Sequence, residues 1–313
     1  MDDRVAVIVV NWNETALTLE CLRSVVASVP EDTAIILVDN GSDVDPCSAI
    51  RQALPQVYVV RLSSNGGYAV GCNAGAHAAL DLGATHLFFL NNDATIEPST
   101  VPVLLEAARR RPRAIFGPKI VYADEPDRVW SAGGTVRRPW MENQHLERGA
   151  PSESVTGARR VDWTTGCALF VLAGTFRLIG PLSEEYFLYL EDLDWCMRAR
   201  SIGIETWCVP DAIVRHRVSS STSRLPRADV LYYGCRNTYR LAFKHSSPRA
   251  RLAMWMVVLV ALAKVITRNM LSPAHRRDPL YRARTLAIVD FILRREGPRR
   301  APPATPLPAS PIG

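Results

Sequence analysis

The sequence predicts an α/β protein with a mostly parallel, doubly wound β-sheet, for three reasons. Short, β-branched apolar runs alternate with segments whose apolar residues recur at helical spacing. Each of these runs ends in a polar or glycine-containing turn, and no internal repeat interrupts the alternation. The composition, with 48% apolar and 22% charged residues over 313 residues, is typical of a globular chain. Sheets of this kind bind ligands beyond the carboxyl ends of their strands, so a site is expected in those turns.

Four runs in the first half have the length and composition of buried strands. They are Val5–Val10, Ala34–Val38, Val57–Leu62 and Thr85–Leu90. Helices are expected between the strands, over Thr15–Val29 and from the Ser-Asn-Gly-Gly turn to Leu80.

The second half alternates less regularly. Residues 122–160 carry scattered Gly, Pro and charge, which predicts a long irregular excursion over one face of the sheet. Apolar character returns at Val161–Leu172, and a helix is expected from Glu191 to Arg200. Further strands are expected at Ile204–Val209 and Ile213–His216, with helical structure from Leu231 onward. Ala301–Gly313 contains five prolines, which predicts a disordered tail.

Charge is spread unevenly over the chain. The segment from Lys244 to Arg300 contains thirteen Lys or Arg and three Asp or Glu, so its net charge is +10. Because the whole chain has a net charge of +6, the remainder carries −4. A basic segment on a mildly acidic body suggests a polyanionic partner such as anionic lipid or nucleic acid. No nucleic-acid recognition motif accompanies it, and aromatic residues are few, so nucleic acid is not expected.

The seven cysteines include no CxxC pair, which excludes a zinc framework, and we expect reduced, buried thiols. The amino terminus is acidic and has no signal-peptide pattern, so we expect a cytoplasmic protein.

Acidic residues and one histidine follow the expected strands at intervals. They are Asp39, Asp93, Asp192 with Asp194, and His216. Chemistry on a nucleoside diphosphate needs such a set, because a divalent cation held by carboxylate and imidazole can neutralise the leaving diphosphate. A separate carboxylate must accept the proton of an attacking hydroxyl, since a carboxylate bound to metal is a weak base.

The order of five motifs resembles family 2 glycosyltransferases, in particular the rhamnosyltransferase-like members that build bacterial cell-surface polysaccharide. The motifs are VVNWNETALTLECLRSV, ILVDNGSD, NGGYAVGCNAG, FFLNNDATIEP and YLEDLDWCMRARSIG, followed by a late histidine. The resemblance covers roughly residues 4–240. Each motif alone is weak, but five in this order are specific. The resemblance implies a GT-A fold and inversion by direct displacement.

The resemblance also implies roles for individual residues. Asp192 matches the catalytic base. Asp93 matches the metal ligand of the DxD-like motif, which here reads Asn-Asn-Asp. His216 matches the late histidine that completes the metal site in some members. The expected cofactor is Mg²⁺ or Mn²⁺. The residues expected to bind the nucleotide sugar are Asn11, Asn13, Asp39, Asn65, Gly66, Gly67, Asn73, Asn92 and Asp93. Asp194 and Trp195 are expected to shape the acceptor pocket.

Each motif also has a purely structural explanation. Asp39-Asn40-Gly41 and Asn65-Gly66-Gly67 are common turn sequences. The acidic residues from Glu191 onward could serve only as the favourable amino-terminal charge of a helix. His216 lies between two arginines, so a surface or phosphate-facing histidine is as consistent with the sequence as a metal ligand. Cys167, which has no base partner in the sequence, is expected to be a packing residue.

The sequence therefore predicts three parts: a catalytic domain at residues 1–240, a basic helical segment at 241–300, and the tail at 301–313. Leu252–Ala263 is uncharged but too short for a normal membrane span. With Trp255 and flanking basic residues it favours contact with an anionic membrane surface, although a buried helix would look similar. The enzyme is accordingly expected at the inner face of the cell membrane, in cell-wall polysaccharide biosynthesis.

The expected reaction transfers a sugar, by resemblance rhamnose from dTDP-rhamnose, to a lipid-linked or growing glycan. Two alternatives stay open at this point. A nucleotidyltransferase shares the sheet and the metal, but would have a Gly-rich, basic loop where Asn11-Trp12-Asn13-Glu14 stands. A non-catalytic scaffold could use the same fold, although keeping both Asp93 and Asp192 argues against it. The oligomeric state is not indicated.

Overall fold

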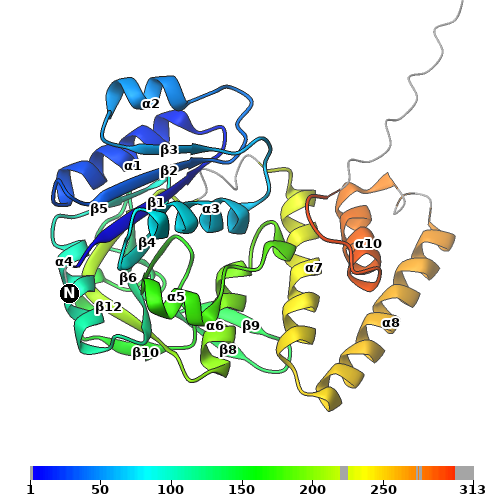
Figure 1. The fold of residues 1–313 in the computed structure, drawn as a ribbon. Coiled ribbons are helices and arrows are strands. Elements are labelled where there is room, and N and C mark those ends of the chain that lie inside the picture. Colours follow the sequence, from blue (N-terminus) through cyan, green and yellow to red (C-terminus); the bar gives the residue numbers. More distant parts are fainter. Residues whose placement is uncertain (1–2, 219–224, 273, 275–276, 300–313) are drawn as a thin grey trace, which may run out of the picture.

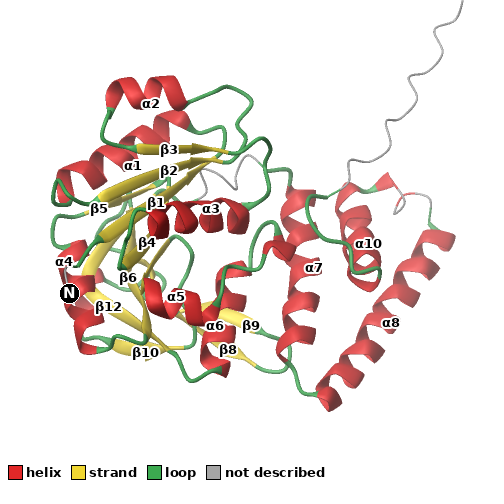
Figure 2. Ribbon diagram, viewed as in Figure 1, coloured by secondary structure: helices red, strands yellow, loops and turns green. Residues whose placement is uncertain are grey.

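The computed structural model describes residues 3–218, 225–272, 274 and 277–299. Within them a large twisted sheet carries helices on both faces, and a group of helices follows it at the carboxyl-terminal side (Figures 1 and 2). The expected tail at 301–313 lies outside the described residues.

The strands of the sheet and of a small hairpin come first. They are β1 (Val5–Asn11), β2 (Ala34–Asp39), β3 (Tyr58–Arg61), β4 (His86–Asn91), β5 (Ala94–Ile96), β6 (Ala114–Tyr122), β7 (Val129–Ser131), β8 (Gly134–Arg137), β9 (Glu142–His145), β10 (Arg159–Val161), β11 (Ala168–Leu172) and β12 (Glu205–His216). The α-helices are α1 (Thr15–Ser28), α2 (Cys47–Ala53), α3 (Tyr68–Asp81), α4 (Thr100–Arg110), α5 (Ala173–Ile179), α6 (Glu191–Ser201), α7 (Arg227–His245), α8 (Pro248–Leu271) and α10 (Pro279–Ile292). Two 3₁₀ turns are η1 (Ser152–Ser154) and η2 (Glu184–Tyr186).

The sheet is mixed, with the strand order β10-β12-β6-β11-β4-β1-β2-β3. The pairs β1–β2, β1–β4, β2–β3 and β6–β12 are parallel, as the alternation of strands and helices predicts. Strand β11 is antiparallel to both β4 and β6 and joins the two parallel halves. The carboxyl ends of β1, β2 and β4 therefore share one edge of the sheet, where their polar residues gather.

Alternating residues of β1 enter two cores. Val5, Val7 and Val9 pack in a cluster with α1 and α4, whereas Ala6 and Ile8 pack with α3 and α6. Because both faces are covered, the strand reads as a continuous apolar run and not as an alternating one. This explains why β1, β2 and β4 could be predicted as buried strands. Strand β3, which was also expected to be buried, ends the strand order and is only partly buried.

The structure differs from the sequence expectation in several elements. Strand β6 and helix α2 were not expected, and the region 122–160 contains β7, the β8–β9 hairpin and β10 in place of an irregular excursion. The two strands expected at 204–216 form one strand, β12, with an irregularity between Val209 and Ile213. Helix α7 runs across residue 240, the boundary expected between the catalytic and the basic segments.

Helix α8 is longer than its uncharged stretch suggested. Its 21-residue stretch Pro248–Arg268 contains an 18-residue window of mean hydropathy 1.9, so α8 is long and apolar enough to cross a membrane by length and composition. The expectation that it is too short rested on counting only uncharged residues, and the charged residues at both ends remain helical. Such a helix can equally belong to the core of a soluble protein, but only 17% of its apolar window is buried here.

All seven cysteines are free, and six of them are buried, as expected.

Candidate active site

Asp93 and His216 are brought together at the carboxyl ends of two neighbouring segments. Asp93 follows β4, and His216 ends β12, which pairs with β5 immediately after Asp93. The Nε2 atom of His216 lies 3.1 Å from Oδ1 of Asp93, and both side chains are largely buried. Burial alone would lower the pKa of His216, but the adjacent Cys167 and Asp93 raise it to about 10.

This pair fits a divalent cation. Two adjacent ligands of an octahedral ion, each about 2.1 Å from it, are about 3 Å apart, which matches the separation of these atoms. A buried imidazole and carboxylate are also suitable donor types for Mn²⁺ and related ions. Among the described residues no group of three or more His, Cys, Asp and Glu converges on one point, so substrate or solvent oxygens would have to complete the coordination.

Asp192 is linked to this pair by a short turn, Thr164–Cys167, whose Cys167 interacts with Asp93, His216 and Asp192. The N–H of Gly166 donates to the Asp192 carboxylate at 2.7 Å, and the carbonyl of Cys167 accepts from Asn91 N–H at the end of β4. The hydroxyl of Tyr68, the first residue of α3, donates to the Gly166 carbonyl at 2.6 Å. One turn thus connects the expected base, the end of β4 and the start of α3.

Asp192 and its neighbour Glu191 have unusual protonation properties. Burial raises the pKa of Asp192, while N–H donors of Gly166 and Leu193 oppose the rise. Burial and the neighbouring Asp192 raise the pKa of Glu191 to about 8. The Oε2 atom of Glu191 is buried without a hydrogen-bond partner, which is consistent with a protonated carboxyl. A carboxylate with a raised pKa is a better proton acceptor than an ordinary one.

A second polar cluster forms where β1 and β2 end. Asp39 is fully buried and accepts hydrogen bonds from Asn11 Nδ2 at 3.0 Å and from Ser42 Oγ, and Arg61 Nε lies 3.3 Å away. Asn13 has a φ of 58° and pairs with Asp43 across the mouth of this cluster. The carboxylate of Asp39 is thus occupied within the protein, with Arg61 half-exposed beside it.

The Asn65-Gly66-Gly67 turn packs beside that cluster. The amide of Asn40 donates to Asn65 Oδ1 and to the Gly67 carbonyl, which joins the turn to the end of β2. Gly67 has a φ of 92°, and a Cβ there would collide with the backbone of Phe187. Gly67 is among the residues expected to bind the nucleotide sugar, but its positive φ and the Phe187 contact by themselves require a glycine here.

Three residues with expected ligand contacts are buried in structural roles. Asn73 binds the backbone of Leu182 and the carboxylate of Glu184. Asp194 is fully buried and bound by Arg198, Lys244 and His245, and the indole of Trp195 donates to the Gly180 carbonyl with no exposed surface. Burial would raise the pKa of Asp194, but His245, Lys244 and Arg198 hold it below its usual range. These side chains can influence a ligand only through their neighbours.

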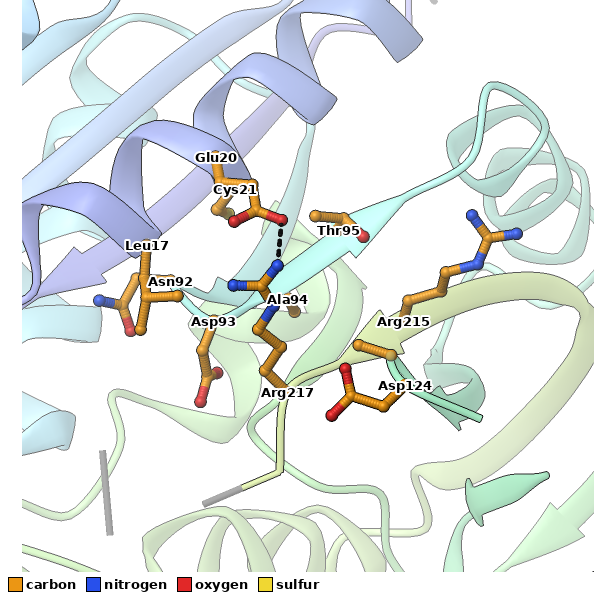
Figure 3. A pocket seen from close by; sticks show the side chains of 11 residues that line it. Leu17, Glu20, Cys21, Asn92, Asp93, Ala94, Thr95, Asp124, Arg215 and Arg217 are labelled. Atoms are coloured by element: carbon orange, nitrogen blue, oxygen red, sulfur yellow. Dashed lines mark hydrogen bonds and ion pairs between the residues drawn. The ribbon is translucent and has the colours of Figure 1, made fainter. Parts of the chain in front are cut away.

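A cavity of about 180 Å³ opens beside Asp93 (Figure 3). Helix α1, the β4–β5 turn and the ends of β6 and β12 line it, and Arg217 crosses it to reach Glu20 at 2.9 Å. Asn92 lies on its wall and donates to Thr18. The volume is smaller than that of a pocket for a whole drug-sized ligand, so the cavity is one part of the site.

Sequence reasoning missed the residues that support Asp192. Tyr68 belongs to the NGGYAVGCNAG motif, whereas Gly166 lies outside the five motifs, and nothing in their spacing indicated that they meet. Cys167 was expected to be a packing residue, and it is buried against His216 and Asp93. Only the antiparallel placement of β11 beside β4 brings this turn to the site.

Comparisons with known proteins agree with this geometry. Residues 6–170 match the sequence model of glycosyl transferase family 2. The chain is 28% identical over 303 residues to an N-acetylglucosaminyl-diphospho-decaprenol L-rhamnosyltransferase of Mycobacterium tuberculosis, covering 88% of this chain and 97% of that protein. It is 21% identical over 257 residues to the dTDP-rhamnosyl transferase RfbF of Shigella flexneri, covering 79% and 83%.

Solved structures share the fold at low sequence identity. S. aureus TarS 1–349 in complex with UDP-GlcNAc superposes with a TM-score of 0.57 at 15% identity, covering 93% of this chain and 81% of that one. The mannosyltransferase PcManGT of Pyrobaculum calidifontis, with GDP-Man and Mn²⁺, gives a TM-score of 0.56 at 14% identity, covering 94% and 88%. The family match and the two relatives favour a glycosyltransferase over the nucleotidyltransferase and the scaffold. The chain belongs to glycosyl transferase family 2 and is a glycosyltransferase with a GT-A fold.

Proposed function

We propose that this enzyme transfers rhamnose from dTDP-rhamnose to a lipid-linked glycan with inversion, using Asp192 as the base. The observation that carries the proposal is the position of Asp192, partly exposed and held by the N–H of Gly166, one residue before Cys167, which interacts with both Asp93 and His216. The donor and acceptor classes are supported by the names of the relatives, one of which acts on N-acetylglucosaminyl-diphospho-decaprenol and another of which is a dTDP-rhamnosyl transferase.

In this mechanism Asp192 accepts the proton of the acceptor hydroxyl while that oxygen attacks the anomeric carbon. The Gly166 N–H donates to one carboxylate oxygen of Asp192 and the Leu193 N–H to the other, which fixes the carboxylate while lone pairs remain to accept the proton. Asp93 and His216 would hold Mg²⁺ or Mn²⁺, which when bound neutralises the departing diphosphate. The cluster at Asn11, Asp39 and Arg61 and the turn at Asn65 would receive the nucleotide. Since Asp39 is buried, we assign it the role of orienting Arg61 and Asn11.

We propose that α8 places the enzyme on the cytoplasmic face of the cell membrane. Its exposed large apolar residues are Leu252, Trp255, Met256, Val257, Leu259, Val260, Ile266, Met270 and Leu271. Arg249 and Arg251 precede this surface, and Lys264 and Arg268 lie toward its end. An apolar face with basic ends is typical of a helix lying in an anionic headgroup region.

The packing of α8 favours a helix that lies on the membrane over one that crosses it. Val258 and Val265 are buried in one cluster with Ile288 of α10, so the helix stays attached to the rest of the protein (Figure 1). The β8–β9 hairpin tip lies beside the start of α8, where Ser246 Oγ donates to the Pro139 carbonyl, and its Trp140 is exposed. This second aromatic residue would sit at the same headgroup level. Such a location would place the active site near a lipid-linked acceptor.

The decisive experiment measures nucleoside diphosphate release from a panel of nucleotide sugars with a lipid-linked acceptor extract and Mg²⁺ or Mn²⁺. Wild type should release dTDP from dTDP-rhamnose, and Asp192→Asn should lower kcat by about 10³-fold. Asn keeps the size of the side chain, so thermal melting should be nearly unchanged. Release with another donor would correct the sugar, and a wild-type rate for Asp192→Asn would overturn the base assignment.

A further inference from the structure

The segment Glu185–Leu190 runs from within η2 to the start of α6 and is called the strap below. Its backbone adopts an unfavourable conformation. Three of its non-glycine residues have positive φ: Phe187 at 63°, Tyr189 at 67° and Leu190 at 72°. This conformation is unfavourable for residues that carry a Cβ, and it persists only where the surroundings enforce it. The strap ends at Leu190, the residue that caps α6 one position before Glu191 and two before Asp192.

Helix α7 enforces this conformation with polar side chains from one face. The Asn237 amide nitrogen lies 3.0 Å from the Tyr186 carbonyl, 2.7 Å from that of Leu188 and 3.0 Å from that of Tyr189. Arg236 donates to the Tyr186 carbonyl at 2.8 Å, and Arg240 donates to that of Glu185. Arg236 and Asn237 have no exposed surface. Buried polar side chains of this kind are expensive unless satisfied, and here the strap carbonyls satisfy them.

The strap also contacts the Asn65-Gly66-Gly67 turn and the start of α3. The Phe187 carbonyl accepts from the N–H of Tyr68 at 3.0 Å, and its backbone fills the space above Gly67. Tyr68 in turn donates its hydroxyl to Gly166, whose N–H holds Asp192. The strap thus contacts both the turn expected to receive the nucleotide and the helix that carries the base.

We propose that Asn237, assisted by Arg236, is a positioning residue for Asp192. It acts by clamping the strap, which sets the start of α6 and so the location of the Asp192 backbone, while Gly166 sets the direction of the carboxylate. Helix α7 lies beyond residues 6–170 that match the family model, so a helix of the carboxyl-terminal part completes the catalytic apparatus. The inference rests on the proposed role of Asp192 as base.

The test compares Asn237→Ala with Tyr233→Phe in steady-state kinetics, with rates normalised to the fraction of molecules that bind nucleotide. Tyr233→Phe is the matched control: on the same helix it loses one hydrogen bond, from Arg299 N–H, but keeps its ring stacked on Phe187. Asn237→Ala should lower kcat at least tenfold and change the donor KM less than about twofold. Tyr233→Phe should keep kcat within about twofold of wild type. If Asn237→Ala does not fold, Asn237→Ser, which keeps one donor, replaces it with a smaller expected loss of kcat.

The outcomes separate this proposal from the proposed function. An unchanged kcat for the Asn237 variants, a change confined to the donor KM, or an equal loss in Tyr233→Phe overturns the clamp while Asp192→Asn remains inactive. A wild-type rate for Asp192→Asn overturns the base assignment itself, and the positioning role falls with it. A loss of kcat in the Asn237 variants together with an inactive Asp192→Asn supports both.

Discussion

Strand β1 and helix α8 have similar apolar compositions but opposite environments. All but one of the residues of β1 are buried between helices on both faces of the sheet, whereas the large apolar residues of α8 are mostly exposed. Helix α7 shows the reverse for polar residues, since its Arg236 and Asn237 are completely buried. Among the carboxyl-terminal helices, α7 thus buries polar groups against the strap, and α8 exposes large apolar groups. An exposed apolar surface like that of α8 is expected if the helix contacts a membrane. Buried polar residues like those of α7 are expected if they position the strap.

The largest expected effect concerns the buried ionic cluster around Asp194, which joins α6 of the catalytic region to the end of α7. Asp194→Asn removes the charge that Arg198, Lys244 and His245 neutralise, and should destabilise the protein by about 3 kcal/mol in urea unfolding at pH 7. Because the folded pKa of Asp194 lies below its unfolded value, its contribution is complete at neutral pH and is lost as pH falls through the folded pKa. The difference between the two proteins should shrink toward pH 3.

A matched control for that prediction is Glu106→Gln, which breaks the exposed pair with Arg110. An exposed pair contributes at most about 1 kcal/mol, so this variant should unfold almost as wild type does. Equal losses of stability for the two substitutions would show that the buried cluster stabilises the protein no more than an exposed ion pair does, and so does not hold α6 and α7 together.

The second effect tests the catalytic region alone. Asp93→Asn and His216→Gln should each lower Mn²⁺ affinity in calorimetry and lower kcat about 10²-fold, because each removes one of two adjacent ligands. His145→Gln is the control: it lies in the same aromatic stack, with Trp130 between it and His216. Unchanged Mn²⁺ binding in both site variants would refute the metal assignment.

The third effect tests the exposed face of α8. Met256→Glu or Leu259→Glu should weaken binding to vesicles of anionic lipid about tenfold, because each places a charge on a surface that would otherwise be buried in lipid. Leu178→Glu on α5 is the control, since Leu178 is similarly exposed but lies in the catalytic region. Equal vesicle binding by all the variants would show that the exposed face of α8 has no special role in membrane binding.

The smallest effect concerns Glu191, next to the base. Its folded pKa, raised to about 8, lies above the unfolded value, so the folded protein retains a proton that the unfolded chain releases. Wild-type stability should therefore fall as pH rises toward 8. Glu191→Gln should lack this fall and gain about 1 kcal/mol relative to wild type between pH 6 and pH 7, in urea unfolding at each pH. A constant difference between the two proteins over that range would contradict the raised pKa.

Much of the fold and part of the site could be predicted from the sequence. The first four strands are local apolar runs that end in turns, and the polar residues after β1, β2 and β4 meet because parallel strands end at one edge. Asp93 and His216, the two expected metal ligands, also meet in the structure, and their binding of a metal stays a prediction. Strand β6 and the β8–β9 hairpin were missed because their stability depends on pairing with distant segments and not on a local pattern.

The sequence alone determined the α/β class, the edge of the sheet that carries the site and the identities of its acidic residues, because these follow from local periodicity and from residue chemistry. Only the tertiary structure decided that Asp194, Trp195 and Asn73 are internal, that the Thr164–Cys167 turn holds Asp192, and that α7 clamps the strap. Those features depend on contacts such as that of Gly166 with Asp192, 26 positions apart, and that of Asn73 with Glu184, 111 positions apart. Burial and hydrogen bonding at such separations depend on how the elements pack, which no local pattern specifies.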